Sequence, residues 1–152
     1  MNNLKISYDD TNTLFSTDMT VTVKDLNYGN HLGYDAIFTL IQEARMRWLQ
    51  VAGMTELAIQ DNTGYLIRSA RAIYQSEAFH GDKLRVQFYV LNTRKASFDI
   101  IYKIDNKDTA QVVALAETSL AFYDYKAKKV TTIPANFLKL LQTNFADNIT
   151  TA

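Results

Sequence analysis

Residues 25–34 read DLNYGNHLGY, and this short stretch holds two of the five glycines and one of the two histidines of the chain. It follows an alternating run, TVTV at 20–23, and precedes an apolar-periodic stretch, DAIFTLIQEARMRWLQVAG at 35–53. The alternation over 16–24 is typical of a strand, whereas a segment so rich in Gly and Asn indicates a loop. The sequence therefore predicts a strand, a polar loop and then a helix.

From about residue 34 to residue 52 the apolar residues recur at three- and four-residue spacings, which predicts a helix about 28 Å long with one buried face. The apolar positions are Ile37, Leu40, Ile41, Ala44, Trp48 and Val51. Gly53 is a suitable residue for ending this helix.

After Gly64 the chain is rich in β-branched and aromatic residues. Turn signals divide it into predicted strands at 65–78, 83–93, 95–104, 109–125 and 130–133. Pro134 then ends the sheet, and a short amphipathic helix is expected over about 135–145. A long helix followed by an antiparallel meander favours an α+β fold, in which a curved sheet wraps the helix. Such a sheet leaves edge strands, so we expect two copies to pair as a homodimer.

The composition narrows the function. With 152 residues, of which 47% are hydrophobic, the chain is expected to form one domain, with a core over about 15–135. Sixteen basic residues balance sixteen acidic ones, so no overall charge favours nucleic acid. The absence of cysteine excludes thiol catalysis and disulfides. No signal peptide or membrane span is evident, so a cytoplasmic location is the expectation.

The quoted stretch and its surroundings resemble the hotdog-fold acyl-CoA thioesterases, in particular the 4-hydroxybenzoyl-CoA thioesterase-like family and the related acyl-ACP thioesterases. The likeness rests on Asp25-Leu26-Asn27, on His31-Leu32-Gly33-Tyr34 and on Glu43-Ala44-Arg45. It continues in FHGDKLRV at 79–86, TRKASF at 93–98 and ETSLAFYD at 117–124, and so covers roughly residues 15–135.

This resemblance implies a single hotdog domain over 1–152, a curved antiparallel sheet wrapped around one long central helix. It implies hydrolysis of acyl-CoA or acyl-ACP to a free acid and a thiol, at a site between two subunits of a homodimer or a dimer of dimers. It implies no metal and no cofactor, since CoA enters only as part of the substrate.

A thioesterase needs donors for the oxyanion that develops on the carbonyl. Gly33 and Tyr34 stand where the long helix should begin, and a helix N-terminus offers unpaired N–H groups and the positive end of the helix dipole. We therefore expect their N–H groups to form the oxyanion site. The alternative is an ordinary tight turn before a helix.

Asn27 matches a position at which the resemblance places a catalytic carboxylate. An amide cannot act as a base or nucleophile, but it can hold water or polarise the thioester oxygen; alternatively, it satisfies loop backbone groups. His31 could donate to the substrate carbonyl or position Asn27, although a lone loop histidine is more often a surface residue. Asp25 could orient either of them.

Glu43 is the best candidate for a catalytic carboxylate, because some hotdog thioesterases use a glutamate on this helix. It lies roughly 14 Å along the helix from Tyr34, so it could join the site only across a dimer. The alternative is an i,i+4 ion pair with Arg47. Asp35, in the first helical turn, is better explained by the helix dipole.

The resemblance also implies that Arg94 and Lys95 bind the phosphates of CoA, a role that suits their charge. Adjacent strand residues point to opposite faces, so only one of the two would reach the ligand directly. The alternative is a solvated turn.

Two other functions fit the same scaffold. One is a non-catalytic module that binds acyl-CoA or acyl-ACP, since Asn27 replaces a carboxylate. The other is a hotdog hydratase or dehydratase, whose motif resembles Asp-x-Asn-Pro-(aliphatic)-His. This chain lacks the proline, and His31 stands one position too far along.

Overall fold

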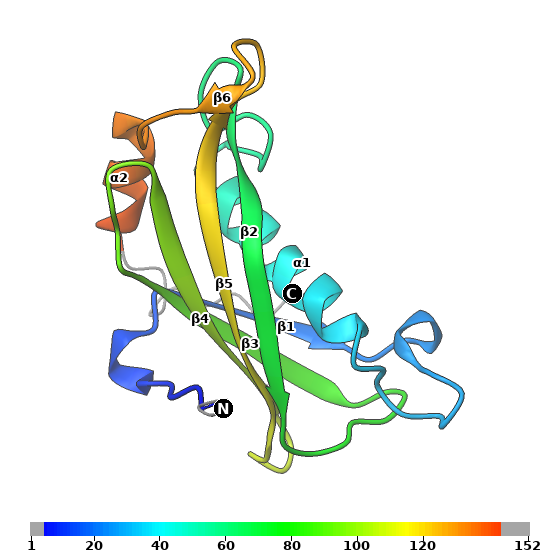
Figure 1. The fold of residues 1–152 in the computed structure, drawn as a ribbon. Coiled ribbons are helices and arrows are strands. Elements are labelled where there is room, and N and C mark those ends of the chain that lie inside the picture. The colour runs from blue at the N-terminus through cyan, green and yellow to red at the C-terminus, as the bar shows by residue number, and fades with distance from the viewer. Residues whose placement is uncertain (1–4, 144–152) are drawn as a thin grey trace.

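The computed structural model describes residues 5–143 and forms one curved antiparallel sheet with a long helix against its face (Figure 1). The elements in chain order are η1 (Asp10–Asn12), β1 (Phe15–Thr20), η2 (Val23–Asp25), α1 (Ala36–Val51), β2 (Thr63–Tyr74), β3 (Lys83–Leu91), β4 (Ser97–Asn106), β5 (Val112–Asp124), β6 (Lys129–Val130) and α2 (Ala135–Leu141). The strands lie in the order β1-β3-β4-β5-β2, and the short β6 pairs with the end of β5. The predicted fold class, a hotdog-type α+β fold, is confirmed.

Helix α1 packs on the sheet through the face that its periodicity predicts. Ala44 and Trp48 are fully buried, and the Trp48 ring meets Phe88 of β3 and Phe137 of α2 edge-on, with centroids 5.3 and 5.6 Å apart. Such aromatic contacts add to the stabilisation that apolar burial provides. One position was wrong: Val51 is exposed, and Leu49 is buried instead.

The boundaries of several elements differ from those predicted. The helix begins at Ala36 rather than at 34, because residues 34 and 35 form a turn that the N–H of Ala36 closes on the carbonyl of Gly33. The first strand ends at Thr20 rather than at 24, because Asp25 closes the 3-10 turn η2 on Thr22. Helix α2 ends at Leu141, and the last part of the helix expected over 135–145 lies outside the described residues.

The arginine of Glu-Ala-Arg is buried between α1 and the sheet. Arg45 donates from Nε to Glu56 at 2.8 Å and from Nη1 to the hydroxyl of Tyr102 at 3.1 Å. Tyr102 is in turn hydrogen-bonded to Thr118 at 2.7 Å. Burial alone would lower the pKa of Arg45, but Tyr102 and Glu56 raise it above its ordinary value. This chain of polar contacts ties the middle of α1 to β4 and β5, and we call it the Arg45 network.

Strand β2 lies at one edge of the sheet and bonds only β5 among the described residues, with an irregularity between Ile67 and Ser69. Residues 69 and 70 in its middle are exposed. A long strand with an open edge can pair with another strand. The homodimer therefore remains a prediction, and the open edge of β2 is a surface at which two copies could pair. The last residue, Tyr74, donates to the backbone carbonyl of Tyr34 at 2.8 Å and thereby joins the end of β2 to the start of α1.

Candidate functional site

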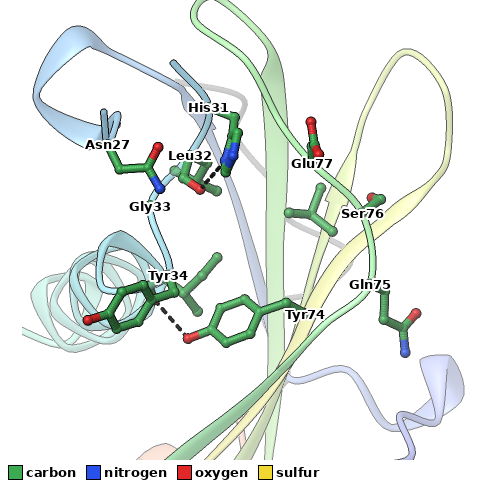
Figure 2. Close-up of a pocket in the computed structure, with 11 residues that line it drawn as sticks. Asn27, His31, Leu32, Gly33, Tyr34, Tyr74, Gln75, Ser76 and Glu77 are labelled. Carbon is green, nitrogen blue, oxygen red and sulfur yellow. Dashed lines mark hydrogen bonds between the residues drawn. The ribbon is translucent and has the colours of Figure 1, made fainter. Parts of the chain in front are cut away.

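A pocket of about 370 Å³ opens beside the N-terminus of α1. One wall consists of Asn27 and residues 31–34, and the other of Tyr74, the last residue of β2, with residues 75–77 that follow it. Ile37 and Val113 complete the lining. Figure 2 shows Asn27, His31 and Glu77 toward one end of the pocket, and Tyr34 with Tyr74 at the other.

Backbone pairing holds the two walls together although they are at least forty residues apart in sequence. The N–H of Leu32 donates to the carbonyl of Ala78 at 2.8 Å, and His31 forms an isolated antiparallel bridge with Phe79. Continuing that antiparallel pairing brings Glu77 opposite Gly33. The loop before α1 and the segment after β2 therefore form one site.

A tight turn builds the wall that carries Asn27. The N–H of Asn27 donates to the carbonyl of His31, and the N–H of Asn30 donates to the carbonyl of Asn27, both at 3.0 Å. Asn30 adopts a left-handed conformation with φ of 65°, which asparagine tolerates better than most residues. The Asn and Gly content of 27–33 thus serves the turn as well as the pocket.

The Asn27 side chain is oriented by the same turn. Its Oδ1 accepts the N–H of Gly29 at 2.9 Å. Because Oδ1 is hydrogen-bonded within the turn, Nδ2 is the amide atom that remains available, and it has no partner among residues 5–143. A Cβ at Gly29 would sit 3.1 Å from Nε2 of His31, so the glycine lets both side chains lie close to the turn. Asn27 consequently offers the pocket a hydrogen-bond donor and not a base.

The two predicted oxyanion donors differ. The N–H of Gly33 donates to the carbonyl of Asp25 at 2.9 Å and is therefore not free, contrary to the expectation. The N–H of Tyr34 has no hydrogen-bond partner within the described part of the chain. Both residues precede α1, and the positive end of its dipole lies at this wall of the pocket. Tyr34 thus remains the candidate donor.

Asp25 does not face Asn27 or His31. Its carboxylate is buried and accepts the N–H and the hydroxyl of Thr22 at 2.8 and 3.0 Å, which closes the turn η2. Lys24 lies 3.7 Å away. Instead of the main pocket it lines a separate cavity of about 260 Å³. The expectation that Asp25 orients Asn27 or His31 is therefore wrong, because the carboxylate caps its own turn.

Glu43 also lies outside the main pocket. It accepts a hydrogen bond from Nε of Arg47 at 2.8 Å, and its side chain is 49% exposed. Arg47 is further held by Thr17 and by the carbonyl of Asp18. The i,i+4 ion pair is thus present within one chain. A catalytic role in a second subunit's pocket remains a prediction.

His31 lines the pocket and is half-buried. Its Nδ1 lies 3.3 Å from the carbonyl oxygen of Leu32, which favours the tautomer with a proton on Nδ1. His80, the other histidine, is exposed and lies in the turn before β3.

Arg94 and Lys95 lie in the β3–β4 turn, next to α2 and distant from the end of β2 (Figure 1). The guanidinium of Arg94 binds both carboxylate oxygens of Asp99, at 3.2 and 3.0 Å. Burial raises the pKa of Asp99, but hydrogen bonds led by that of Arg94 outweigh it and hold the pKa below its ordinary value. The backbone carbonyl of Lys95 accepts the N–H of Ile133. Binding of CoA phosphates by this turn remains a prediction, and it would require a second subunit to approach.

The sequence did not single out Tyr74 or Glu77, which line the pocket from the end of β2 and from the segment that follows it. Locally, this segment looks like the end of a strand followed by the HGD turn. No local signal marks either residue, because their position depends on the pairing of 78–79 with 31–32.

With this geometry in place, comparison with known families gives a clear result: the model of the thioesterase-like superfamily matches residues 21–141. The chain belongs to the thioesterase-like superfamily. Membership supports thioester hydrolysis as the general class of reaction. A comparison with curated proteins found no match.

Solved structures of other proteins share the fold of this thioesterase-like chain. Slr0204 from Synechocystis, a 1,4-dihydroxy-2-naphthoyl-CoA thioesterase, superposes with a TM-score of 0.78 at 18% identity, over 84% of this chain and 95% of that one. The protein SAV2348 from Staphylococcus aureus, solved in complex with CoA, gives 0.77 at 15% identity, over 93% and 86%. A DHNA-CoA thioesterase from Staphylococcus aureus gives 0.75 at 12% identity, over 84% and 88%.

Two other features are absent within residues 5–143, a cluster of metal ligands and a membrane-spanning helix. No group of three or more His, Cys, Asp or Glu side chains is arranged to hold a metal ion. No helix there combines the length and apolar content needed to cross a membrane.

Proposed function

We propose that this protein hydrolyses acyl-CoA or acyl-ACP thioesters to a free acid and a thiol in the pocket beside the N-terminus of α1. The observation that carries the proposal is that two hydrogen-bond donors of pocket-lining residues, Nδ2 of Asn27 and the N–H of Tyr34, have no partner among residues 5–143. Donors fixed before the reaction stabilise the negative charge that grows on a carbonyl oxygen as it is attacked. The dipole of α1 acts in the same direction.

The pocket also suits the shape of a thioester. It is open to solvent at a rim that carries the exposed rings of Tyr34 and Tyr74, and Leu32, Ile37 and Val113 provide apolar lining. An acyl group can lie against that apolar surface while the carbonyl meets the donors.

We further propose that the protein works as a homodimer joined at the open edge of β2. Tyr74 ends that strand and lines the pocket, so a subunit paired there would lie beside the site. Only from a second subunit could Glu43, Arg94 and Lys95 reach this pocket. The CoA complex of SAV2348, a protein of similar fold, supports CoA as the carrier.

A thiol-release assay tests the proposal. Purified protein is mixed with acetyl-, hexanoyl-, palmitoyl- and benzoyl-CoA and with an acyl-ACP, and free thiol is followed with a chromogenic disulfide. We expect release from at least one substrate, and a loss of about 10²–10³-fold in kcat in Asn27→Ala, the magnitude typical of removing one oxyanion donor.

Two other results would contradict hydrolysis. Saturable binding of acyl-CoA without thiol release would indicate a non-catalytic acyl-binding module, the alternative that the amide at position 27 favours. Consumption of an enoyl-CoA double bond without thiol release would indicate a hydratase.

A further inference from the structure

We propose that Glu77 is the general base that activates water in this pocket. The inference rests on the proposed thioesterase function and adds to it the carboxylate that Asn27 does not supply. Among the residues that line the pocket, Glu77 is the only one with a carboxylate. Without a general base, the attacking water would keep both of its protons in the transition state, and hydrolysis would be slow.

Glu77 differs from the other three glutamates of the chain in having no partner among the described residues. Glu43 pairs with Arg47, Glu56 with Arg45, and Glu117 with Arg71 at 2.7 Å. Glu77 makes no hydrogen bond or ion pair through its side chain with any other residue in the range 5–143. In each of these pairs the arginine occupies a lone pair on one carboxylate oxygen, whereas both oxygens of Glu77 are available to accept a proton.

The backbone on both sides of Glu77 is held in place even though the side chain is free within the described part of the chain. Ala78, the next residue, is fully buried and accepts the N–H of Leu32. Ser76, the preceding residue, donates its hydroxyl to the carbonyl of Val112 at 2.7 Å. The Cα of Glu77 is thus fixed opposite the loop that carries Asn27, and the side chain reaches the pocket from that point (Figure 2).

The two walls supply complementary groups. Asn27 commits Oδ1 to the N–H of Gly29 and leaves a donor, while Glu77 on the facing segment provides an acceptor. His31 is a weaker candidate base, because its Nε2 lies against Gly29 in the turn. A thioester carbonyl held by Asn27 and Tyr34 would therefore have its carbon approached by water from the Glu77 wall.

The reaction balances with these groups alone. Glu77 takes a proton from water as the water oxygen bonds to the carbonyl carbon, and the electron pair displaced from the C=O bond rests on the oxygen that Asn27 and Tyr34 hold. When that pair returns, the C–S bond breaks and its electrons leave on sulfur. The Glu77 carboxyl then gives its proton to the thiolate, which yields a carboxylic acid and a thiol and regenerates the carboxylate.

Glu77→Gln tests the assignment because it keeps the shape of the side chain and removes its basicity. We expect kcat for thiol release to fall about 10²–10⁴-fold. The affinity for a non-hydrolysable thioether analogue of the best substrate should stay within about threefold, because a general base acts on the transition state and not on substrate binding. Asp108→Asn, the same chemical change in the exposed β4–β5 turn, is the matched control and should leave both values unchanged.

Chemical rescue separates a base from a structural residue. Glu77→Ala leaves space for a small carboxylate, so formate should restore part of its kcat, whereas formate should not change kcat in Asp108→Asn. Glu77→Gln that keeps wild-type kcat while the wild-type protein is active would overturn the inference and leave the thioesterase proposal standing. Loss of activity in Glu43→Gln but not in Glu77→Gln would do the same. A wild-type protein that releases no thiol from any substrate would overturn both.

Discussion

Two groups of polar residues, one at the middle of helix α1 and one beside its start, have opposite environments. In the Arg45 network, the charge of Arg45 is buried and bound by Glu56 and Tyr102. At the pocket, donors of Asn27 and Tyr34 and the carboxylate of Glu77 have no partner among the described residues. The first arrangement stabilises the fold, because each group is satisfied within the protein. The second leaves groups whose hydrogen bonds can be made to a substrate.

Of the substitutions that test this difference, we expect the largest effect, a loss of stability, from breaking the Arg45 network. Arg45→Met removes the buried cation, so that Glu56 and Tyr102 lose a group to which they are hydrogen-bonded. We therefore expect the free energy of unfolding to fall by about 3–5 kcal/mol. Urea denaturation followed by circular dichroism measures it. The double variant Arg45→Met with Glu56→Gln should recover part of the loss, because no unpaired buried charge remains.

The matched control for that experiment is Arg71→Met. Arg71 pairs with Glu117 in a comparable way, but its side chain is 41% exposed. Ion pairs at the surface contribute about 0–1 kcal/mol. Equal losses in Arg45→Met and Arg71→Met would show that burial of the network does not distinguish the two arginines.

At the pocket, the corresponding change is Asn27→Asp. The aspartate would keep one oxygen on the N–H of Gly29 and turn the other, now a negatively charged acceptor, toward the substrate. We expect kcat to fall about 10²–10³-fold, because a donor to the oxyanion is replaced by a charge that repels it. Asn30→Asp, in the same turn but not lining the pocket, should keep wild-type kcat. A faster enzyme with Asn27→Asp would mean that this position needs a carboxylate.

The sequence predicted those parts of the molecule that depend on local pattern. The apolar spacing of Ile37, Leu40 and Ile41 identified the buried face of α1, since one helix face repeats every three or four residues. The turn signals indicated the number and order of the long strands. Resemblance then linked these elements to a known fold, and the family match agrees with it.

The site was predicted less completely, because its geometry depends on contacts between distant segments. Glu77 reaches the pocket only through the pairing of Ala78 with Leu32. The N–H of Gly33 donates to the backbone carbonyl of Asp25, eight residues earlier, and the Asp25 carboxylate accepts the N–H of Thr22 in the turn η2. Glu43 satisfies the local ion-pair pattern that was its alternative explanation. Sequence spacing identifies residue types near a helix start, but it does not say which hydrogen bonds they make.

A smaller effect is expected where the two walls of the pocket join. Tyr74→Phe removes the hydroxyl that donates to the carbonyl of Tyr34 at 2.8 Å. One such bond contributes about 0.5–1.5 kcal/mol, so we expect kcat/KM to fall about 2- to 10-fold as the Tyr34 N–H loses its fixed position. Tyr28→Phe is the control, because the Tyr28 ring is fully exposed and makes no such bond within residues 5–143. Equal values for both variants would show that the Tyr74 hydroxyl does not position the donor.

The smallest effect, on stability, is expected from two carboxylates of β4: Asp99, which is paired with Arg94, and Asp105, which is not paired within residues 5–143. The pKa of Asp99 is lowered because its hydrogen bonds, led by that from Arg94, outweigh the effect of burial. Its contribution to stability is therefore present above the ordinary aspartate pKa and is lost as the pH falls through the lowered value in the folded state. Burial raises the pKa of Asp105, whose Oδ1 has no partner within residues 5–143, so its charged form destabilises the fold at neutral pH.

Substitution of each carboxylate by an amide should consequently shift stability in opposite directions. At pH 7, Asp99→Asn should lower the melting temperature and Asp105→Asn should raise it. The changes should be small, since Arg94 is half exposed and exposed pairs contribute at most about 1 kcal/mol. As the pH falls below the lowered pKa of Asp99, both differences should shrink, because the native side chains become protonated in the folded and unfolded states alike. Thermal unfolding at several pH values measures this, and parallel shifts of the same sign would mean that hydrogen bonding does not set the two environments apart.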